Sequence, residues 1–204
     1  MEPLRNIAPI SVEQYLDLDQ RMPQGVKLEY FDGYLFCNGY LIDPLGAREE
    51  AVAMAGGSPN HNVLAATIGA ALVNGLPDNY HVSGSGQQTK FHPASRYGYP
   101  DAVAACDPDF NGVILQNPQL IVEVLSPSTA AYDLGRKFEA YKQWPSVEEI
   151  WFVWQDVVCV RQHFRTDRDT WSERIYTTLE TALVSDYFGL RVPLSAVYQR
   201  VRRT

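Results

Sequence analysis

The segment LIVEVLS, residues 120–126, is the part of the chain that most constrains its fold. The segment is almost continuously apolar, which is typical of a central strand covered on both faces. Glu123 nevertheless stands in its middle, and burying an ionised carboxylate without a partner is costly. The run therefore predicts a sheet with helices packed on its faces. Glu123 predicts a bound cation, a buried Arg or Lys partner, or an edge position facing water.

The remaining patterns predict short strands and helices within one domain of 204 residues. A capping box from Ser11 to Gln14 predicts a helix ending near Asp19, and Asp32-Gly33 predicts the turn of a hairpin. The sum is a mixed β-sheet flanked by helices, in the α/β (α+β) class. Further expected elements are a loop over 40–57, a helix beginning at Ser58-Pro59, strands within 80–93 and over 100–106, a helix over 130–143, a hairpin of 148–154 with 157–164, a strand over 171–179 and a short helix within 192–201.

Composition restricts the function classes. The net charge of −7 argues against binding nucleic acid over the whole surface, but it is compatible with a local basic groove and with carboxylates around a cation. No apolar stretch approaches the ~20 residues that span a bilayer, and the N-terminus has no apolar signal core, so we expect a cytoplasmic protein without a membrane segment. The three cysteines are widely separated and predict free thiols.

Two carboxylates are placed for a shared cation. Asp101 follows Pro100 at the start of one predicted strand, and Glu123 lies within another. Neighbouring strands would bring the two side chains together. Mg²⁺ prefers one or two carboxylates, completed by waters and phosphate oxygens. A bound divalent ion would also supply the countercharge that Glu123 needs, so these residues predict a Mg²⁺ site.

The helix after SPST carries Asp133, Lys137 and Tyr141 at intervals of four residues, on one face. One interpretation is an exposed ion pair worth only about 0.3–0.5 kcal/mol, with Tyr141 covering the edge of the sheet. The other directs Lys137 at the strand carboxylates, where an ammonium can hold an attacking water and stabilise charge developing on phosphorus. The spacing alone does not separate the two.

Together these segments resemble the Uma2 family (DUF820), restriction-endonuclease-like proteins of the PD-(D/E)XK nuclease superfamily. The resemblance is carried by PDAVAACDPD, by LIVEVLSPSTAAYDLGRKFEAYKQWPSVEEIWFV, by LEYFDG and by the helix entered through SPNHN. It covers residues 26–154 as a family core. An N-terminal helical segment, 1–25, precedes the core, and a C-terminal hairpin, strand and short helix, 155–204, follow it in the same domain.

The resemblance implies a restriction-endonuclease-like fold and Mg²⁺-dependent cleavage of DNA, with Mn²⁺ as a substitute. Asp101 matches the first carboxylate of the superfamily motif and Glu123 the second, and Val124 would offer a backbone carbonyl to the metal. The sequence departs from the motif at its third position, where Leu125 replaces Lys. In this family the lysine is expected on the following helix, where Lys137 stands.

Weaker candidates surround this core. Glu29 in LEYFDG could assist the metal, or it could be one polar residue of an alternating hairpin. His61, at the start of a helix, is expected to hydrogen-bond locally. Asp133 is a candidate partner of Lys137. Substrate contacts are also predicted for Gln88, Lys90, Asp133 and Tyr141, with ordinary surface residues as the alternative for Gln88 and Lys90.

The first expected function is therefore a metal-dependent endonuclease that cuts DNA as a homodimer and leaves a 5′-phosphate, as the resemblance implies. A nuclease-like fold does not guarantee activity. A binding or structural protein that no longer cuts remains an alternative, as does a metal-dependent hydrolase of a smaller phosphodiester.

Overall fold

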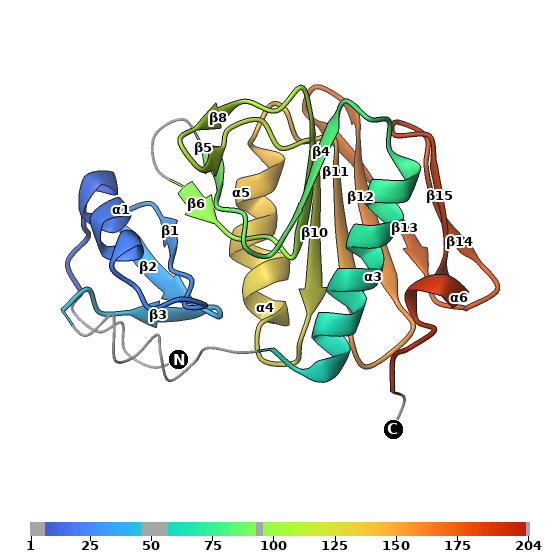
Figure 1. The fold of residues 1–204 in the computed structure, drawn as a ribbon, viewed down its shortest axis with the longest axis horizontal. Coiled ribbons are helices and arrows are strands. Elements are labelled where there is room, and N and C mark those ends of the chain that lie inside the picture. The colour runs from blue at the N-terminus through green and yellow to red at the C-terminus, as the bar shows by residue number, and fades with distance from the viewer. Residues whose placement is uncertain (1–6, 46–56, 93–95, 203–204) are drawn as a thin grey trace.

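A computed structural model describes residues 7–45, 57–92 and 96–202 of the chain. Within these residues the strands form a sheet of seven strands, a sheet of six and a two-stranded hairpin, with helices packed against them (Figure 1). The mixed α/β class is confirmed, although the strands divide among separate sheets where one mixed sheet was expected. No described helix is long and apolar enough to cross a membrane.

The six-stranded sheet has β10 (Leu120–Leu125) in its interior, with every residue of the strand buried. β10 pairs in parallel with β11 (Glu149–Trp154) and antiparallel with β7 (Ala102–Cys106). β11 pairs along the whole of β10, and β7 pairs with residues 120–122 on the other edge, which allows the apolar run to be shielded from water. The outer strands are β4 (Tyr80–Gly84), β12 (Val160–Asp167) and β13 (Thr170–Tyr176).

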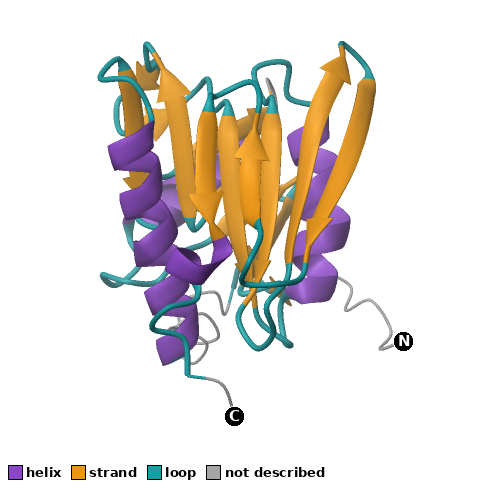
Figure 2. Ribbon diagram, turned by 90° about the vertical axis from the view of Figure 1, so that its right-hand side faces the viewer, coloured by secondary structure: helices purple, strands orange, loops and turns teal. Residues whose placement is uncertain are grey.

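Helices cover both faces of this sheet, as Figure 2 shows. On one face, buried side chains of α3 (Pro59–Gly75) cluster with Val122. On the other, α5 (Phe138–Lys142) contributes to a cluster that contains Ile121. Because side chains alternate along a strand, Glu123 projects on the same face as Ile121, towards α5. The predicted central strand between helices is thus confirmed.

The seven-stranded sheet contains the predicted N-terminal hairpin, which turns at Asp32-Gly33. Both turn residues have positive φ, +52° and +99°, as the Asp-Gly pair predicts for a two-residue turn. The strands, in their order across the sheet, are β3 (Tyr40–Ile42), β2 (Tyr34–Cys37), β1 (Glu29–Phe31), β6 (Arg96–Gly98), β5 (Thr89–His92), β9 (Ile114–Leu115) and β8 (Phe110–Asn111).

Helix α1 (Val12–Gln20) packs against this sheet at the left of Figure 1. The predicted capping box is present: the Ser11 side chain accepts a hydrogen bond from the backbone of Gln14, whose side chain accepts one from Ser11. Tyr15 stacks on Tyr30 with ring centroids 5.0 Å apart. The helix is therefore held by its cap at one end and by aromatic packing along its buried face.

Several connections differ from expectation. The segment 40–57, expected to be a loop, contains β3, and residues 46–56 lie outside the described part of the chain. A hairpin of β14 (Ala182–Ser185) and β15 (Leu190–Pro193) precedes the C-terminal helix α6 (Leu194–Val197). These strands have three or four residues, which is too few for an alternating pattern to be recognised.

The helix predicted over 130–143 is present but is not uniform. The backbone N–H of Phe138 donates to the carbonyl of Asp133, five residues earlier, so the middle of the helix is π-helical. Such turns are rare and are frequent at functional sites. The three parts are α4 (Ala130–Tyr132), the π-helical η1 (Asp133–Lys137) and α5.

We expect Gly33→Ala to destabilise the fold. A Cβ at Gly33 would lie 2.7 Å from the Cβ of Pro9, in a residue whose φ is already positive. The strain and the contact together should lower the free energy of unfolding by about 1–3 kcal/mol. Gly69→Ala, inside α3 with nothing within 4 Å of the new Cβ, should instead raise it by about 0.5–1 kcal/mol. Urea denaturation measures both, and shifts of the same sign would contradict this account.

Candidate active site

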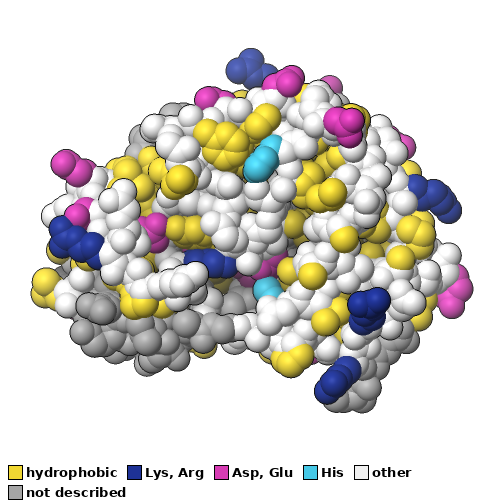
Figure 3. All heavy atoms as spheres, in the orientation of Figure 1, with side chains coloured by type: hydrophobic (Ala, Val, Ile, Leu, Met, Phe, Trp, Pro, Cys, Tyr) yellow, Lys and Arg dark blue, Asp and Glu magenta, His cyan; other side chains and the backbone are white. Residues whose placement is uncertain are grey.

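A cavity of about 640 Å³ opens at the end of β10, beside the β1–β2 hairpin and the first residues of α3. In Figure 3, acidic, basic and histidine side chains meet in a hollow near the middle of the molecular face. Residues of both large sheets and of two helical segments line the cavity, so no single element contains the site. Its charged and histidine side chains are Lys27, Glu29, His61, Asp101, Glu123, Asp133 and Lys137.

Asp101 and Glu123 are neighbours across the end of a β ladder. Ala102 of β7 is paired with Val122 of β10 in an antiparallel register. One step further along each strand are Asp101 and Glu123. Opposite residues of antiparallel strands project from the same face of the sheet. The register therefore brings both predicted carboxylates into one cavity.

The carboxylate of Glu123 is bonded through one oxygen. Its Oε1 lies 3.1 Å from Nζ of Lys137 and accepts a hydrogen bond from the hydroxyl of Tyr141. These contacts place Lys137 and Tyr141 on one face of the helical segment, turned towards β10. Of the three arrangements expected for Glu123, the structure therefore shows the buried lysine partner. Its Oε2 accepts no hydrogen bond from the described residues.

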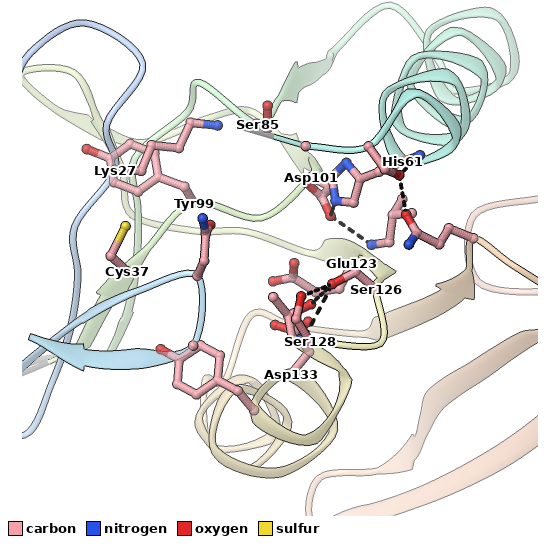
Figure 4. A pocket seen from close by; sticks show the side chains of 18 of the residues that line it. Lys27, Cys37, His61, Ser85, Tyr99, Asp101, Glu123, Ser126, Ser128 and Asp133 are labelled. Atoms are coloured by element: carbon pink, nitrogen blue, oxygen red, sulfur yellow. Dashed lines mark hydrogen bonds and ion pairs between the residues drawn. The ribbon is translucent and has the colours of Figure 1, made fainter. Parts of the chain in front are cut away.

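Asp101 is also held through one oxygen. Its Oδ2 accepts a hydrogen bond of 2.8 Å from the backbone N–H of Val124 and lies 3.1 Å from Nε2 of His61. Figure 4 shows the His61 ring beside Asp101 at the start of α3. His61 was expected to hydrogen-bond locally; its backbone N–H bonds to the cap Ser58, but its ring contacts Asp101 in the site. Oδ1 of Asp101 has no hydrogen-bond donor in the described structure.

Lys137 lies among three carboxylates. Besides its contact with Glu123, its Nζ is 3.0 Å from Oε1 of Glu29 and 3.3 Å from Oδ1 of Asp133. Glu29 reaches the cluster past Gly98 of the neighbouring strand, where a Cβ would lie only 3.0 Å from Oε1 of Glu29. The absence of a side chain at Gly98 therefore allows this close approach. The structure brings Glu29 and Asp133 to the predicted site.

Burial dominates the ionisation of this cluster. It raises the pKa of Glu123 well above its ordinary value and raises the pKa of Glu29 and of Asp133, against the lowering effect of the Lys137 charge. Burial by itself would lower the pKa of Lys137. The surrounding carboxylates outweigh it and hold that pKa well above the usual range. Lys137 is therefore a permanent ammonium in the folded protein.

The residues suited to hold a cation are Asp101 and Glu123, each with one oxygen free of described donors. Among the described residues, no group of three or more His, Cys, Asp or Glu side chains is arranged to hold a metal ion. A Mg²⁺ site built from two carboxylates, waters and phosphate oxygens does not need such a group. Four carboxylates and two lysines line the cavity, so ionisation of all six with His61 neutral leaves two negative charges, which one divalent cation would balance.

Three of the four predicted substrate contacts, Gln88, Lys90 and Tyr141, do not line the cavity, whereas Asp133 does. Tyr141 is fully buried and its hydroxyl donates a hydrogen bond to Glu123. Gln88 is buried and donates hydrogen bonds to the hydroxyl of Tyr15 and the carboxylate of Asp19, so it belongs to the scaffold. Nζ of Lys90 lies 5.8 Å from the ring centroid of Tyr97. Burial and internal bonding thus explain Gln88, while a role for Lys90 in phosphate contact stays a prediction.

Sequence reasoning missed Lys27, which lines the cavity. It stands two residues before Glu29, and positions i and i+2 of an extended segment share one side. That alternation is a signal from which Lys27 could have been found. No comparable signal connected His61 with Asp101, because 40 residues and several elements separate them.

The fold and the cavity define a mixed α/β protein with an acidic site at the end of its central strand. The sequence pattern of the Uma2 family, described as "Putative restriction endonuclease", matches residues 45–195, and the chain belongs to this family. The resemblance expected from the sequence is thereby confirmed, over a range that begins and ends later than 26–154. Asp101, Glu123 and Lys137 lie inside the matched residues, whereas Glu29 precedes them.

Individual proteins are also similar to this chain. The chain is 32% identical over 165 residues to "Uncharacterized protein slr1290" of Synechocystis sp. (strain ATCC 27184 / PCC 6803 / Kazusa), covering 79% of this chain and 77% of that protein. It is 33% identical over 122 residues to "Uncharacterized protein sll1609" of the same organism, covering 57% and 68%. The crystal structure of "a putative nuclease belonging to DUF820" from Anabaena variabilis ATCC 29413 is similar, with a TM-score of 0.69 at 12% identity over 95% of this chain and 100% of that chain. This likeness shows the fold.

Proposed function

We propose that this protein is a metal-dependent endonuclease that hydrolyses phosphodiester bonds in DNA. The observation that carries the proposal is the pair of carboxylates at Asp101 and Glu123, each with one free oxygen, beside the buried ammonium of Lys137. The description of its family as "Putative restriction endonuclease" supports nucleic acid as the substrate class.

The two free carboxylate oxygens, with the carbonyl of Val124, would hold Mg²⁺ or Mn²⁺. When bound, the ion would lower the pKa of a water and neutralise charge on the phosphate. The protein's own contribution is orientation. His61 and the Val124 N–H hold Asp101 through Oδ2, and Tyr141 holds Glu123 through Oε1. Both free oxygens are thereby fixed before substrate binds.

Lys137 would supply the remaining charge. Its three donors are directed at Glu29, Glu123 and Asp133, and its positive charge can stabilise the charge that develops on phosphorus. Glu29 and Asp133 fix the ammonium at 3.0 and 3.3 Å, so its position does not depend on substrate. We propose a homodimer for cutting both strands of a duplex, because one such cavity acts on one phosphodiester at a time.

One observation favours a protein that binds without cutting. Lys137 already neutralises Glu123, so the buried carboxylate is satisfied without a metal. The net charge of the protein is −7, whereas a strong binder of duplex DNA carries an excess of positive charge. A hydrolase of a smaller phosphodiester would use the same groups and differ only in substrate.

Incubation with supercoiled plasmid and with single-stranded DNA separates these functions. We expect nicked and linear products with Mg²⁺ or Mn²⁺ and none with EDTA, because the carboxylate oxygens need the ion to act on phosphate. Mg²⁺ should also raise Tm, since it binds the native site. Cleavage that persists in EDTA would sink the proposal. Absent cleavage with a metal-insensitive Tm favours the binding protein, and turnover confined to bis(p-nitrophenyl) phosphate favours the small substrate.

A further inference from the structure

Lys27 is a cation of the cavity that the proposed chemistry does not use. It lines the cavity on the wall opposite His61 (Figure 4). Its Nζ forms no ion pair with any described residue, and it lies 5.9 Å from the ring centroid of Tyr99. Lys137, in contrast, contacts three carboxylates. The charge of Lys27 is therefore available to an incoming anion.

The wall that carries Lys27 is held by a buried network. The carboxylate of Asp19 accepts hydrogen bonds from the backbone N–H of Leu28, next to Lys27, and from the hydroxyl of Tyr99. Gln88 donates to the same carboxylate at 2.9 Å. These bonds fix both the backbone beside Lys27 and the ring below its ammonium. A side chain anchored in this way loses less entropy when it binds a ligand.

Charge explains which ligand suits this position. Burial lowers the pKa of Lys27, so the ammonium is incompletely solvated and gains from an anionic partner. The acidic residues of the cavity have other close partners: Glu29, Glu123 and Asp133 contact Lys137, and Asp101 contacts His61. A lysine contacts phosphate as a point charge, without the fixed two-bond geometry of arginine. Such a contact adds affinity and position but no base preference.

We propose that Lys27 binds a second phosphate of a DNA strand, adjacent to the phosphate held at Asp101 and Glu123. This inference rests on the proposed function and specifies its substrate: a strand with consecutive phosphates, in preference to an isolated phosphodiester. The cavity of about 640 Å³ extends from the carboxylates to Lys27, so one strand can occupy both positions.

Binding without cleavage tests the inference. The probes are fluorescein-labelled thymidine oligomers with one or two phosphodiester linkages, measured by fluorescence anisotropy with Ca²⁺ in place of Mg²⁺, so that a cation at Asp101 and Glu123 can hold the first phosphate. We expect the wild type to bind the two-linkage oligomer about 5–10-fold more tightly, with a salt slope steeper by about 0.7. Lys27→Met should bind both oligomers equally, whereas Lys27→Arg keeps the preference. Lys142→Met, outside the cavity, is the matched control and should behave as the wild type.

The outcomes distinguish this inference from the proposed function. An unchanged preference in Lys27→Met overturns the role of Lys27, even if plasmid cleavage is observed. A preference that depends on Lys27 supports it, even if cleavage is absent and the nuclease proposal fails. If the wild type does not distinguish the two oligomers, or binds neither, the inference is wrong. Loss of fold in Lys27→Met is detected by its Tm, and Lys27→Gln, which keeps a polar side chain without the charge, then decides: equal binding of the two oligomers supports the inference and a retained preference overturns it.

Discussion

Glu123→Gln is expected to abolish metal-dependent cleavage and to leave the protein folded. Loss of a group that supports a metal ligand costs about 10–100-fold, so loss of the charged ligand itself should cost at least about 10³-fold in cleavage rate. The fold should survive because glutamine has the same shape. Its carbonyl oxygen can accept the hydrogen bonds of Lys137 and Tyr141, and Lys137 keeps two other carboxylates.

Glu149→Gln is the matched control, a buried carboxylate on the neighbouring strand outside the cavity. Glu149 accepts hydrogen bonds from Trp151, Gln162 and Ser185. An amide oxygen there can keep the bonds from Trp151 and Gln162, but the amide nitrogen replaces the acceptor of the Ser185 hydroxyl, which should lower the free energy of unfolding by about 1–3 kcal/mol. Cleavage per folded molecule should be retained. Initial rates on plasmid DNA, beside urea denaturation curves, measure both effects. Wild-type cleavage by Glu123→Gln would falsify the metal site.

Lys137→Met is expected to cause the largest loss of stability, together with loss of cleavage. Within the described structure, Lys137 is the cation in contact with Glu29, Glu123 and Asp133. Its removal would leave three buried carboxylates without a close countercharge. Breaking a buried pair in this way costs about 3–5 kcal/mol. Urea denaturation at neutral pH measures this loss.

The loss in free energy of unfolding caused by Lys137→Met should become smaller as the pH falls. Burial raises the pKa of the three carboxyl groups, so the folded state binds protons more readily than the unfolded state. Stability from such groups is present at low pH and is lost as the pH rises through the folded pKa. We therefore expect a smaller deficit near about pH 5 than near about pH 8.

Lys142→Met provides the matched control on the same helical segment. Its ion pair with Glu139 is at the surface, with the Glu139 side chain 63% exposed. The change should therefore stay within about 0.5 kcal/mol at every pH. A deficit of Lys137→Met that did not vary with pH, or that matched Lys142→Met, would contradict a carboxylate cluster held by Lys137.

The parts of the fold that sequence patterns predicted are those whose stabilising contacts are local or repeated. β10 is an unbroken apolar strand, α1 begins with a capping box, and the β1–β2 hairpin turns at Asp32-Gly33. The patterns missed β3 and the β14–β15 hairpin, because strands of three or four residues depend on pairing partners that are not visible in the sequence. The π-helical turn at Asp133–Lys137 was also missed, since it changes the backbone and not the order of apolar residues.

The candidate site likewise contains residues that the sequence could propose and contacts that only the tertiary structure makes. Asp101, Glu123 and Lys137 could be proposed from the sequence, because a carboxylate in an apolar strand demands a partner. Their common cavity depends on the register of β7 with β10 and on the packing of the following helix. The tertiary structure added Lys27 and His61 to the site, and of these two only Lys27 had a sequence signal, its alternation with Glu29.

By itself, the sequence determined the central strand, the class of fold, the family and the need of Glu123 for a positive partner. Only the tertiary structure decided which charges meet: Lys137 pairs with Glu123, His61 with Asp101, and Lys27 has no close anionic partner among the described residues. The physical reason is the range of the interactions. Caps, turns and apolar periodicity act between residues close in sequence, whereas a cluster of buried charges is assembled from several elements by packing and pairing register.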